Sequence, residues 1–154
     1  MTFEEKNIEE VLEIKRERLY NLYFHAPFCM GILMGSNYVY EMASAYYLQL
    51  LGKKDIIGKT VKEVSPELEA QGIYSFLNTV YKTGETVSVN EMLVQLDLHG
   101  NRKKVDAYLN FIFQAHRNSS GVVVGIFFFV NDVTKQVVSR KKIEESKKKI
   151  SISF

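Results

Sequence analysis

Hydrophobic residues recur with helical spacing near the start of the chain. Over residues 2–23 one apolar stripe runs along a helix whose other faces carry Glu, Lys and Arg. The stripe consists of Ile8, Val11, Leu12, Leu19, Leu22 and Tyr23. Pro27 ends this helix, because proline lacks the backbone donor and the residue before it avoids the helical region. The stripe also fits a heptad seam with Lys15 as its one charge, so a lone helix and a parallel helix pair both stay open.

Two short apolar runs follow and predict the first two strands. They are CMGILM at 29–34 and YVYEMA at 38–43, and Gly35-Ser36-Asn37 between them is typical of a hairpin turn. Ser44 can then cap a short helix that turns Tyr47, Leu48 and Leu51 inward and ends at Gly52.

Helical spacing returns over residues 72–85, with Ile73, Phe76, Leu77 and Val80 on one face. Three strands follow at 86–97, 103–116 and 122–130, separated by turn residues at 98–101 and 118–121. After Asn131 a charged helix begins, with Asp132 or Thr134 placed to cap it. This order predicts an α+β domain with a five-stranded antiparallel sheet and helices on one face.

Alternation along the last two strands assigns their side chains to two faces. One face carries Leu109, Phe111, Phe113, Ile126, Phe128 and Val130. Phe127 and Phe129 fall on the opposite face, which Asn110 and Gln114 mark as the outer one. We expect the N-terminal helix or a second protomer to cover these two phenylalanines, because they would otherwise form an exposed apolar patch.

The composition is that of an ordinary globular chain. The 154 residues are 46% hydrophobic, which suits one domain of about 110 residues with an incoming and an outgoing helix. The formal net charge of +2 is too close to neutral for nucleic acid to be the expected partner. Seven basic and two acidic residues lie between Val133 and Ile150, so the positive excess belongs to the tail.

The sequence lacks the residues and motifs that several classes of function require. The single cysteine, Cys29, excludes an internal disulfide framework and Cys-rich metal sites, and it permits a reducing cytoplasm, which is the expected location. No signal peptide and no run of about 18 apolar residues is present, so no membrane contact is expected. The phosphate-loop, GxSxG, HExxH and kinase motifs are missing, and Glu63, Glu67 and Glu69 fit a solvated turn, so we predict no catalytic residue and no metal ligand.

Five segments, in this order, resemble the PAS family of sensor domains over residues 24–134. They are HAPFCMGIL at 25–33, VYEMASAYYLQLLG at 39–52, IGKTVKEVSPEL at 57–68, FLNTVYKTGE at 76–85 and GVVVGIFFFVNDVT at 121–134. Ser44 and Ala45 stand where many relatives carry Asn-Pro, a conservative change at a helix start. The resemblance implies a PAS-like sensor domain over 25–134, between an N-terminal amphipathic helix at 1–24 and the start of a signalling helix at 135–154.

PAS domains hold small ligands in an apolar pocket, and the resemblance implies one here. The candidate lining residues are Tyr40, Met42, Phe76, Leu77, Val80, Leu109, Phe111, Phe113, Ile126, Phe128 and Val130. The alternative is that these large side chains simply fill the core.

The cofactors of PAS relatives can be compared with the residues present. Relatives that bind flavin covalently carry a GRNCRFLQ-like helix, but the corresponding stretch here has no cysteine. Haem-binding relatives place an axial histidine on the long helix, and residues 72–85 contain none. His25, His99 and His116 lie in an entry loop, a turn and a strand end, and they form no ligand set. The sequence thus argues against covalent flavin and haem and leaves noncovalent flavin or an uncharged metabolite open.

The resemblance implies a noncatalytic sensor that relays to a downstream effector in the same polypeptide, with a sensor histidine kinase as the first candidate. Asp132 and Thr134 would join the last strand to the signalling helix. The candidate surfaces for a homodimer are Ile8, Leu12, Leu19, Leu22, Phe127 and Phe129. The alternative function is a dimerisation or protein-interaction scaffold with a filled core and no ligand.

Overall fold

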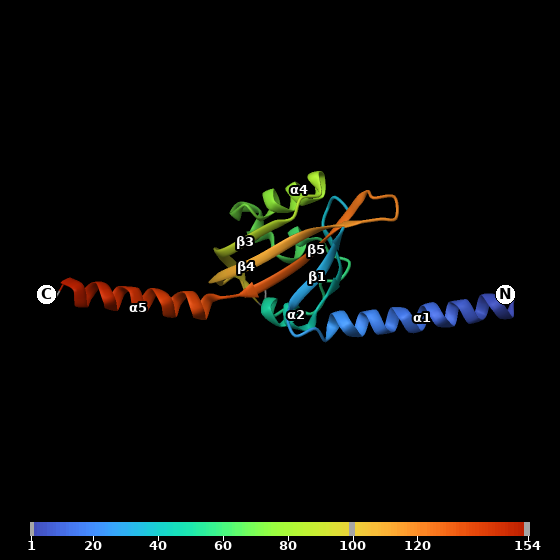
Figure 1. Ribbon diagram of the computed structural model, residues 1–154, viewed down its shortest axis with the longest axis horizontal. Helices are drawn as coiled ribbons and strands as arrows, with labels where there is room; N and C mark the ends of the chain where they lie inside the picture. The colour runs from blue at the N-terminus through green and yellow to red at the C-terminus, as the bar shows by residue number, and fades with distance from the viewer. Residues whose placement is uncertain (1, 99–100, 153–154) are drawn as a thin grey trace.

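The computed structural model of the protein describes residues 2–98 and 101–152 (Figure 1). In chain order the elements are α1 (Phe3–Phe24), β1 (Cys29–Met34), β2 (Val39–Ala43), α2 (Ala45–Leu51), α3 (Val61–Val64), the 3₁₀ helix η1 (Pro66–Gln71), α4 (Ile73–Thr83), β3 (Val87–Asp97), β4 (Lys104–Arg117), β5 (Val123–Asp132) and α5 (Thr134–Ile152). The predicted turn at His99 and Gly100 lies outside the described residues. The short helices α3 and η1 occupy the stretch in which the sequence indicated only turns.

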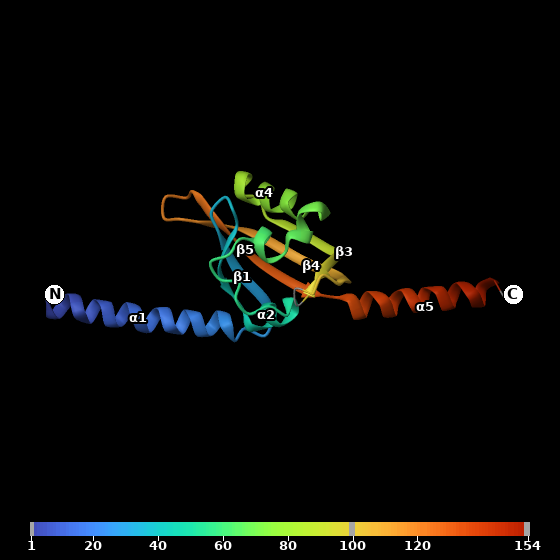
Figure 2. The ribbon, with the colours of Figure 1, turned by 180° about the vertical axis from the view of Figure 1, so that it is seen from behind.

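The strands form one antiparallel sheet in the order β2-β1-β5-β4-β3. The predicted α+β class and five-stranded antiparallel sheet are confirmed. The segments α2, α3, η1 and α4 cover one face and enclose the hydrophobic core with it (Figure 2). On the other face α5 contacts β4 near Tyr108, so helices touch both sides of the sheet.

Phe128 holds the centre of this core against β1. Its strand partner Gly31 has no side chain, and a Cβ there would overlap the Phe128 ring and the carbonyl oxygen of Met42. The Phe128 ring packs against Tyr47, with centroids 4.7 Å apart, and edge-on against Tyr40 at 5.9 Å. Glycine at position 31 thus lets an aromatic ring lie flat on the sheet, beside the site described below.

The terminal helices run away from the domain at opposite ends (Figure 1). A capping box in which Thr2 and Glu5 each bond the other's backbone N–H begins α1, and α1 buries none of its residues. The last turns of α5 are likewise exposed. No helix in the described part of the chain is long and apolar enough to span a membrane.

Candidate functional site

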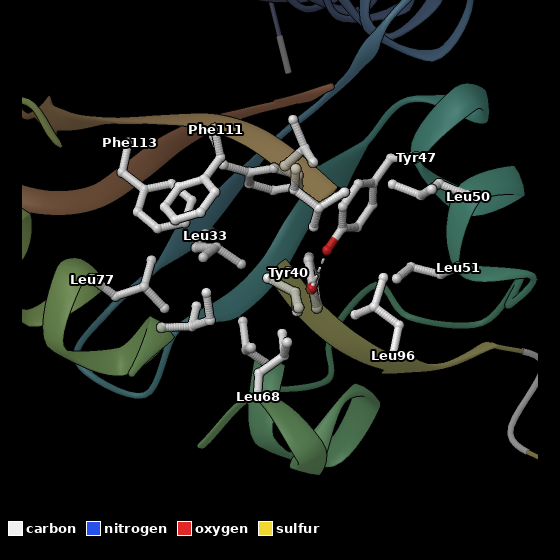
Figure 3. Close-up of a pocket in the computed structure, with 16 residues that line it drawn as sticks. Leu33, Tyr40, Tyr47, Leu50, Leu51, Leu68, Leu77, Leu96, Phe111 and Phe113 are labelled. Carbon is white, nitrogen blue, oxygen red and sulfur yellow. Dashed lines mark hydrogen bonds between the residues drawn. The ribbon is translucent and has the colours of Figure 1, made fainter. Parts of the chain in front are cut away.

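A cavity of about 70 Å³ lies between the sheet and the helices that cover it (Figure 3). All five strands contribute side chains to its wall, and so do α2, α3, η1 and α4. The wall consists of Leu33, Tyr40, Tyr47, Leu50, Leu51, Val61, Leu68, Ile73, Leu77, Val94, Leu96, Leu109, Phe111, Phe113, Phe128 and Val130. Each is an aliphatic residue, a phenylalanine or a tyrosine, so the site presents no charge to a ligand.

The cavity's polar groups are the hydroxyls of Tyr40 and Tyr47, which point toward each other in Figure 3. Their oxygens are 2.7 Å apart, and either hydroxyl can be the donor. A pair joined by one hydrogen bond uses one of its two O–H hydrogens, and no other described residue bonds either hydroxyl. The pair therefore keeps one donor available in an apolar cavity.

Burial keeps both phenols protonated. It raises the pKa of Tyr47 to about 12, and it raises the pKa of Tyr40 well above its ordinary value, with the neighbouring Tyr47 adding to the effect. Both groups are neutral hydrogen-bond donors throughout the physiological pH range.

Seven of the predicted pocket residues line this cavity. They are Tyr40, Leu77, Leu109, Phe111, Phe113, Phe128 and Val130. Val80 and Ile126 are fully buried where α4 packs on β5, but they do not reach the cavity wall. Phe76 is partly buried and packs edge-on against Phe111, with centroids 5.6 Å apart, but it is not part of the cavity wall.

Met42 does not belong to the cavity, and its assignment to this face is wrong. Tyr40 pairs with Leu33 and Met42 with the adjacent Ile32, so Glu41 is an extra residue that reverses the alternation of β2. As a result Ala43 joins the core. Met42 instead lines an outer groove between the end of α1 and α2, together with Tyr20, Tyr23, Phe24 and Leu48.

The remaining wall residues were not among the pocket residues predicted from the sequence. Tyr47 is the most important of them, because it carries one of the two hydroxyls of the cavity. The helical spacing of Tyr47 and Leu51 already turned both inward, which is the signal that could have placed them in the pocket. Leu68 lies on η1, whose residues follow no periodic pattern. Val94 and Leu96 lie on β3, where the bulge prevents alternation from predicting which face of the sheet their side chains occupy.

The predicted exit residues join β5 to α5. Asp132 Oδ1 accepts hydrogen bonds from the backbone N–H of Thr134, at 2.9 Å, and from the Thr134 hydroxyl. The Thr134 hydroxyl in turn accepts the backbone N–H of Tyr108 on β4 at 2.9 Å, and Val133 N–H donates to the Tyr108 carbonyl at 2.8 Å. The first turn of α5 is therefore attached to β4 as well as to its own strand.

The predicted dimer surface is accessible along α1. Ile8, Leu12, Leu19 and Leu22 are between 45% and 70% exposed. Phe127 and Phe129 lie half-buried on the outer face of the sheet, where Phe127 packs beside His116. Because α1 contacts β2 and buries no residue, the expectation that the N-terminal helix covers these phenylalanines is wrong, and the second-protomer alternative stays a prediction.

The titratable residues considered as cofactor ligands are scattered. Burial and the nearby Asp132 raise the pKa of the Cys29 thiol to about 11, so this thiol is a poor nucleophile. His25 ends α1 and packs edge-on against Phe24, His116 lies beside Phe127, and His99 falls outside the described residues. Over residues 2–98 and 101–152 no three His, Cys, Asp or Glu side chains are grouped to hold a metal ion.

The chain thus combines an apolar cavity between an antiparallel sheet and short helices with a helix that follows the last strand. The family profile of the PAS fold matches residues 23–138, and the chain belongs to this family. PAS domains are generally noncatalytic sensory modules.

Among solved structures, VqmA bound to DPO is 27% identical to this chain, with a TM-score of 0.58 over 75% of this chain and 56% of the other. The VqmA dimer of Vibrio cholerae in the absence of target DNA is also 27% identical, with a TM-score of 0.60 over 77% and 52%. This chain thus spans about half the length of VqmA. A sensor histidine kinase from Vibrio cholerae, 19% identical with a TM-score of 0.52 over 82% and 95%, shares the fold.

Proposed function

We propose that this chain is a noncatalytic sensor domain that binds a small uncharged molecule and relays the binding to an effector domain through α5. The observation that carries the proposal is the apolar cavity with a tyrosine pair that keeps one hydrogen-bond donor unused. The similarity to VqmA, whose structure with DPO shows a bound molecule, supports a ligand-binding function.

The cavity wall defines the chemistry of the ligand. A charged molecule would lose its hydration without gaining a charged partner, because no lining residue is ionised. The unused O–H favours a ligand that is apolar over most of its surface and carries one hydrogen-bond acceptor. Ligand sites usually measure about 300–1,000 Å³, so a ligand larger than a few atoms requires α2 or η1 to move outward.

Phenol and toluene provide a matched pair of probes, since they have similar shape and differ in one polar group. We expect both to shift the NMR signals of cavity residues such as Leu77 and Leu96, with phenol binding more tightly. The combined Tyr40→Phe and Tyr47→Phe variant should lose the preference for phenol, whereas Tyr20→Phe on the exposed α1 should keep it. Native mass spectrometry of the protein purified from its own host then reports a natural ligand. No shift at the cavity with either probe, and no bound molecule, would contradict the proposal.

The small volume of the cavity supports a second candidate. At about 70 Å³ the cavity is well below the roughly 300–1,000 Å³ of a usual ligand site, so large side chains occupy most of the space between the sheet and the helices. A scaffold that serves dimerisation or protein contact needs no larger cavity. The same titration separates the two functions, because a scaffold stays unchanged at probe concentrations that saturate a sensor.

We propose that the domain works as a homodimer paired through α1. The supporting observation is that the apolar stripe of α1 is exposed in the single chain. An amphipathic helix usually buries such a stripe against a partner. Light scattering should show a dimer that the combined Leu12→Ala and Leu19→Ala variant dissociates. Ile14→Ala is the matched control, because Ile14 is as exposed as Leu12 but lies off the seam. A monomer at high concentration, unchanged by deletion of residues 2–23, would overturn this part of the proposal.

The effector is proposed to follow α5 in the same polypeptide, in the cytoplasm. A histidine kinase is the first candidate, since a sensor kinase shares the fold. A DNA-binding regulator is the second, since VqmA forms a complex with DNA. A ligand can drive the relay only if it binds more tightly to one arrangement of α5 than to the other.

A further inference from the structure

An ion pair links β3 to α5 across 49 positions of sequence. The two guanidinium Nη atoms of Arg140 donate to the two carboxylate oxygens of Glu91, at 2.6 and 2.9 Å. The side chains keep about half of their surface exposed, 51% for Arg140 and 40% for Glu91. A bidentate pair fixes the direction of both side chains, whereas a single contact leaves them free to rotate.

Glu91 is held in an unusual backbone conformation at a bulge of β3. Val89 pairs with Phe111 and Met92 with Leu109, so two residues of β3 lie opposite Asn110. Glu91 has a φ of 53°, in the left-handed region that side chains other than glycine rarely adopt. Its backbone N–H donates to Asn110 Oδ1 at 2.7 Å, which holds the bulge in place. The bulge turns the carboxylate out of the strand and toward α5.

A second contact attaches the same turns of α5 to β4. Lys141 Nζ donates to the Tyr108 hydroxyl at 2.8 Å and lies 4.7 Å from the centre of its ring. Val137 on the inner side of the helix is 1% exposed. The helix is therefore bound to the domain as far as Lys141, and the exposed turns beyond this residue follow the direction set there.

The strand that carries Glu91 also forms part of the cavity wall. Val94 and Leu96 line the cavity, and Val94 lies three residues beyond Glu91, a distance of about 10 Å along a strand. β3 stands at the edge of the sheet and pairs with β4 on one side. Its other side is bonded to η1, because the Gln71 side chain exchanges two hydrogen bonds with the Gln95 backbone, at 2.7 and 2.8 Å. In addition, Glu67 Oε1 accepts the Asp97 backbone N–H at 3.1 Å. Since η1 also lines the cavity through Leu68, β3 and η1 would shift together.

We infer that Glu91 is the positioning residue of the signal exit, through which a shift of β3 at the cavity is passed to Arg140 and sets the direction of α5. This inference rests on the proposed relay through α5. A ligand that displaces Val94 or Leu96 would move the bulge, and the bidentate pair would move the helix with it. The contacts of Asp132 and Thr134 would act as the pivot.

The test follows the direction of α5 by double electron–electron resonance, which measures the distance between two spin labels on the full chain. Spin labels are placed at Ser119→Cys, in the exposed turn between β4 and β5, and at Ser146→Cys on α5, in a Cys29→Ala background. Labelled chains are mixed with an excess of unlabelled chain, so that distances within one protomer are measured. Glu91→Gln and Arg140→Gln should each broaden the distance distribution roughly twofold, and the exchanged pair Glu91→Arg with Arg140→Glu should narrow it again.

Two further variants separate positioning from stability. Glu144→Gln is the matched control, because Glu144 contacts the Nε of the same arginine at 3.8 Å but lies on α5 itself, and the distribution should stay narrow. Glu91→Gly suits the positive φ, so the thermal midpoint should hold or rise while the distribution broadens. Distributions that stay narrow in Glu91→Gln and Arg140→Gln would overturn the inference.

Adding phenol distinguishes this inference from the proposed sensor function. Phenol should shift the mean distance in the parent chain, and this shift should disappear in Glu91→Gln although phenol still binds at the cavity. A shift of equal size in Glu91→Gln would overturn the role of Glu91 and leave the relay intact. Binding without any shift in the parent chain would contradict the relay itself.

Discussion

Removing the hydroxyls of the cavity tyrosines one at a time tests the central feature of the site. Tyr40 is 2% exposed and Tyr47 is 8% exposed, so neither hydroxyl can turn to water when its partner is lost. Tyr40→Phe and Tyr47→Phe each remove the 2.7 Å hydrogen bond and leave the other hydroxyl buried without a partner. The combined variant removes both polar groups and leaves no such orphan.

The expected energies follow from this difference. Each single variant should lower the free energy of unfolding by about 1–3 kcal/mol, which is the cost of a buried group left unsatisfied. The combined variant should lose no more than about 1 kcal/mol, because replacing both partners by apolar groups is nearly neutral. With about 4 °C of thermal midpoint per kcal/mol for a chain of this size, the combined variant should melt above at least one single variant.

Urea unfolding followed by far-UV circular dichroism measures all three free energies. Tyr20→Phe, the same chemical change at an exposed position of α1, serves as the control and should leave the midpoint unchanged. The slope with urea should be the same for every variant, since the surface exposed on unfolding hardly differs. If the loss in the combined variant equals the sum of the two single losses, the hydroxyls do not share a hydrogen bond and the polar site is refuted.

Three further outcomes are expected. Gly31→Ala should cost about 3 kcal/mol or more by thermal unfolding, because its Cβ overlaps the Phe128 ring and a backbone carbonyl that cannot yield; a loss below about 1 kcal/mol would show that β1 and β5 can separate. Iodoacetamide should alkylate Cys29 at pH 8 roughly a hundredfold more slowly in the folded chain than in urea, because burial raises the thiol pKa from 9.0 to about 11; equal rates would contradict this. Arg140 lowers the pKa of Glu91, so the pair is complete above the ordinary glutamate pKa of about 4.3 and is lost as the pH falls through the lower folded value; an NMR titration should therefore give a higher Glu91 midpoint in Arg140→Gln than in the parent.

Local pattern was sufficient for most of the elements. The helical period predicted residues 2–23 and 72–85, against Phe3–Phe24 and Ile73–Thr83 in the structure. Gly52 ends α2 in the left-handed conformation, as its position after Leu51 indicated, and Gly84, just beyond Lys82 and Thr83, ends α4 in the same way. These features depend on residues within one or two helical turns of each other, so they can be predicted from the sequence.

The two β-bulges could not be predicted from local sequence pattern. Strict alternation placed Met42 inside, but the extra residue Glu41 in β2 turned it outward. The bulge at Glu91 has the same character, because nothing in VSVNEMLVQLD marks where the register shifts. A bulge is decided by how two strands fit against each other, and this information lies in the partner strand and in the helices packed on the sheet.

The sequence by itself determined the kind of molecule: a single α+β domain with five antiparallel strands, a mostly apolar interior and a charged helix at each end. Periodicity, turn residues and caps depend on residues a few positions apart, so they can be recognised in the sequence alone. The tertiary structure decided which side chains meet. The Tyr40–Tyr47 hydroxyl pair and the Glu91–Arg140 link bring together residues on different elements, and only the packed sheet and helices set those distances.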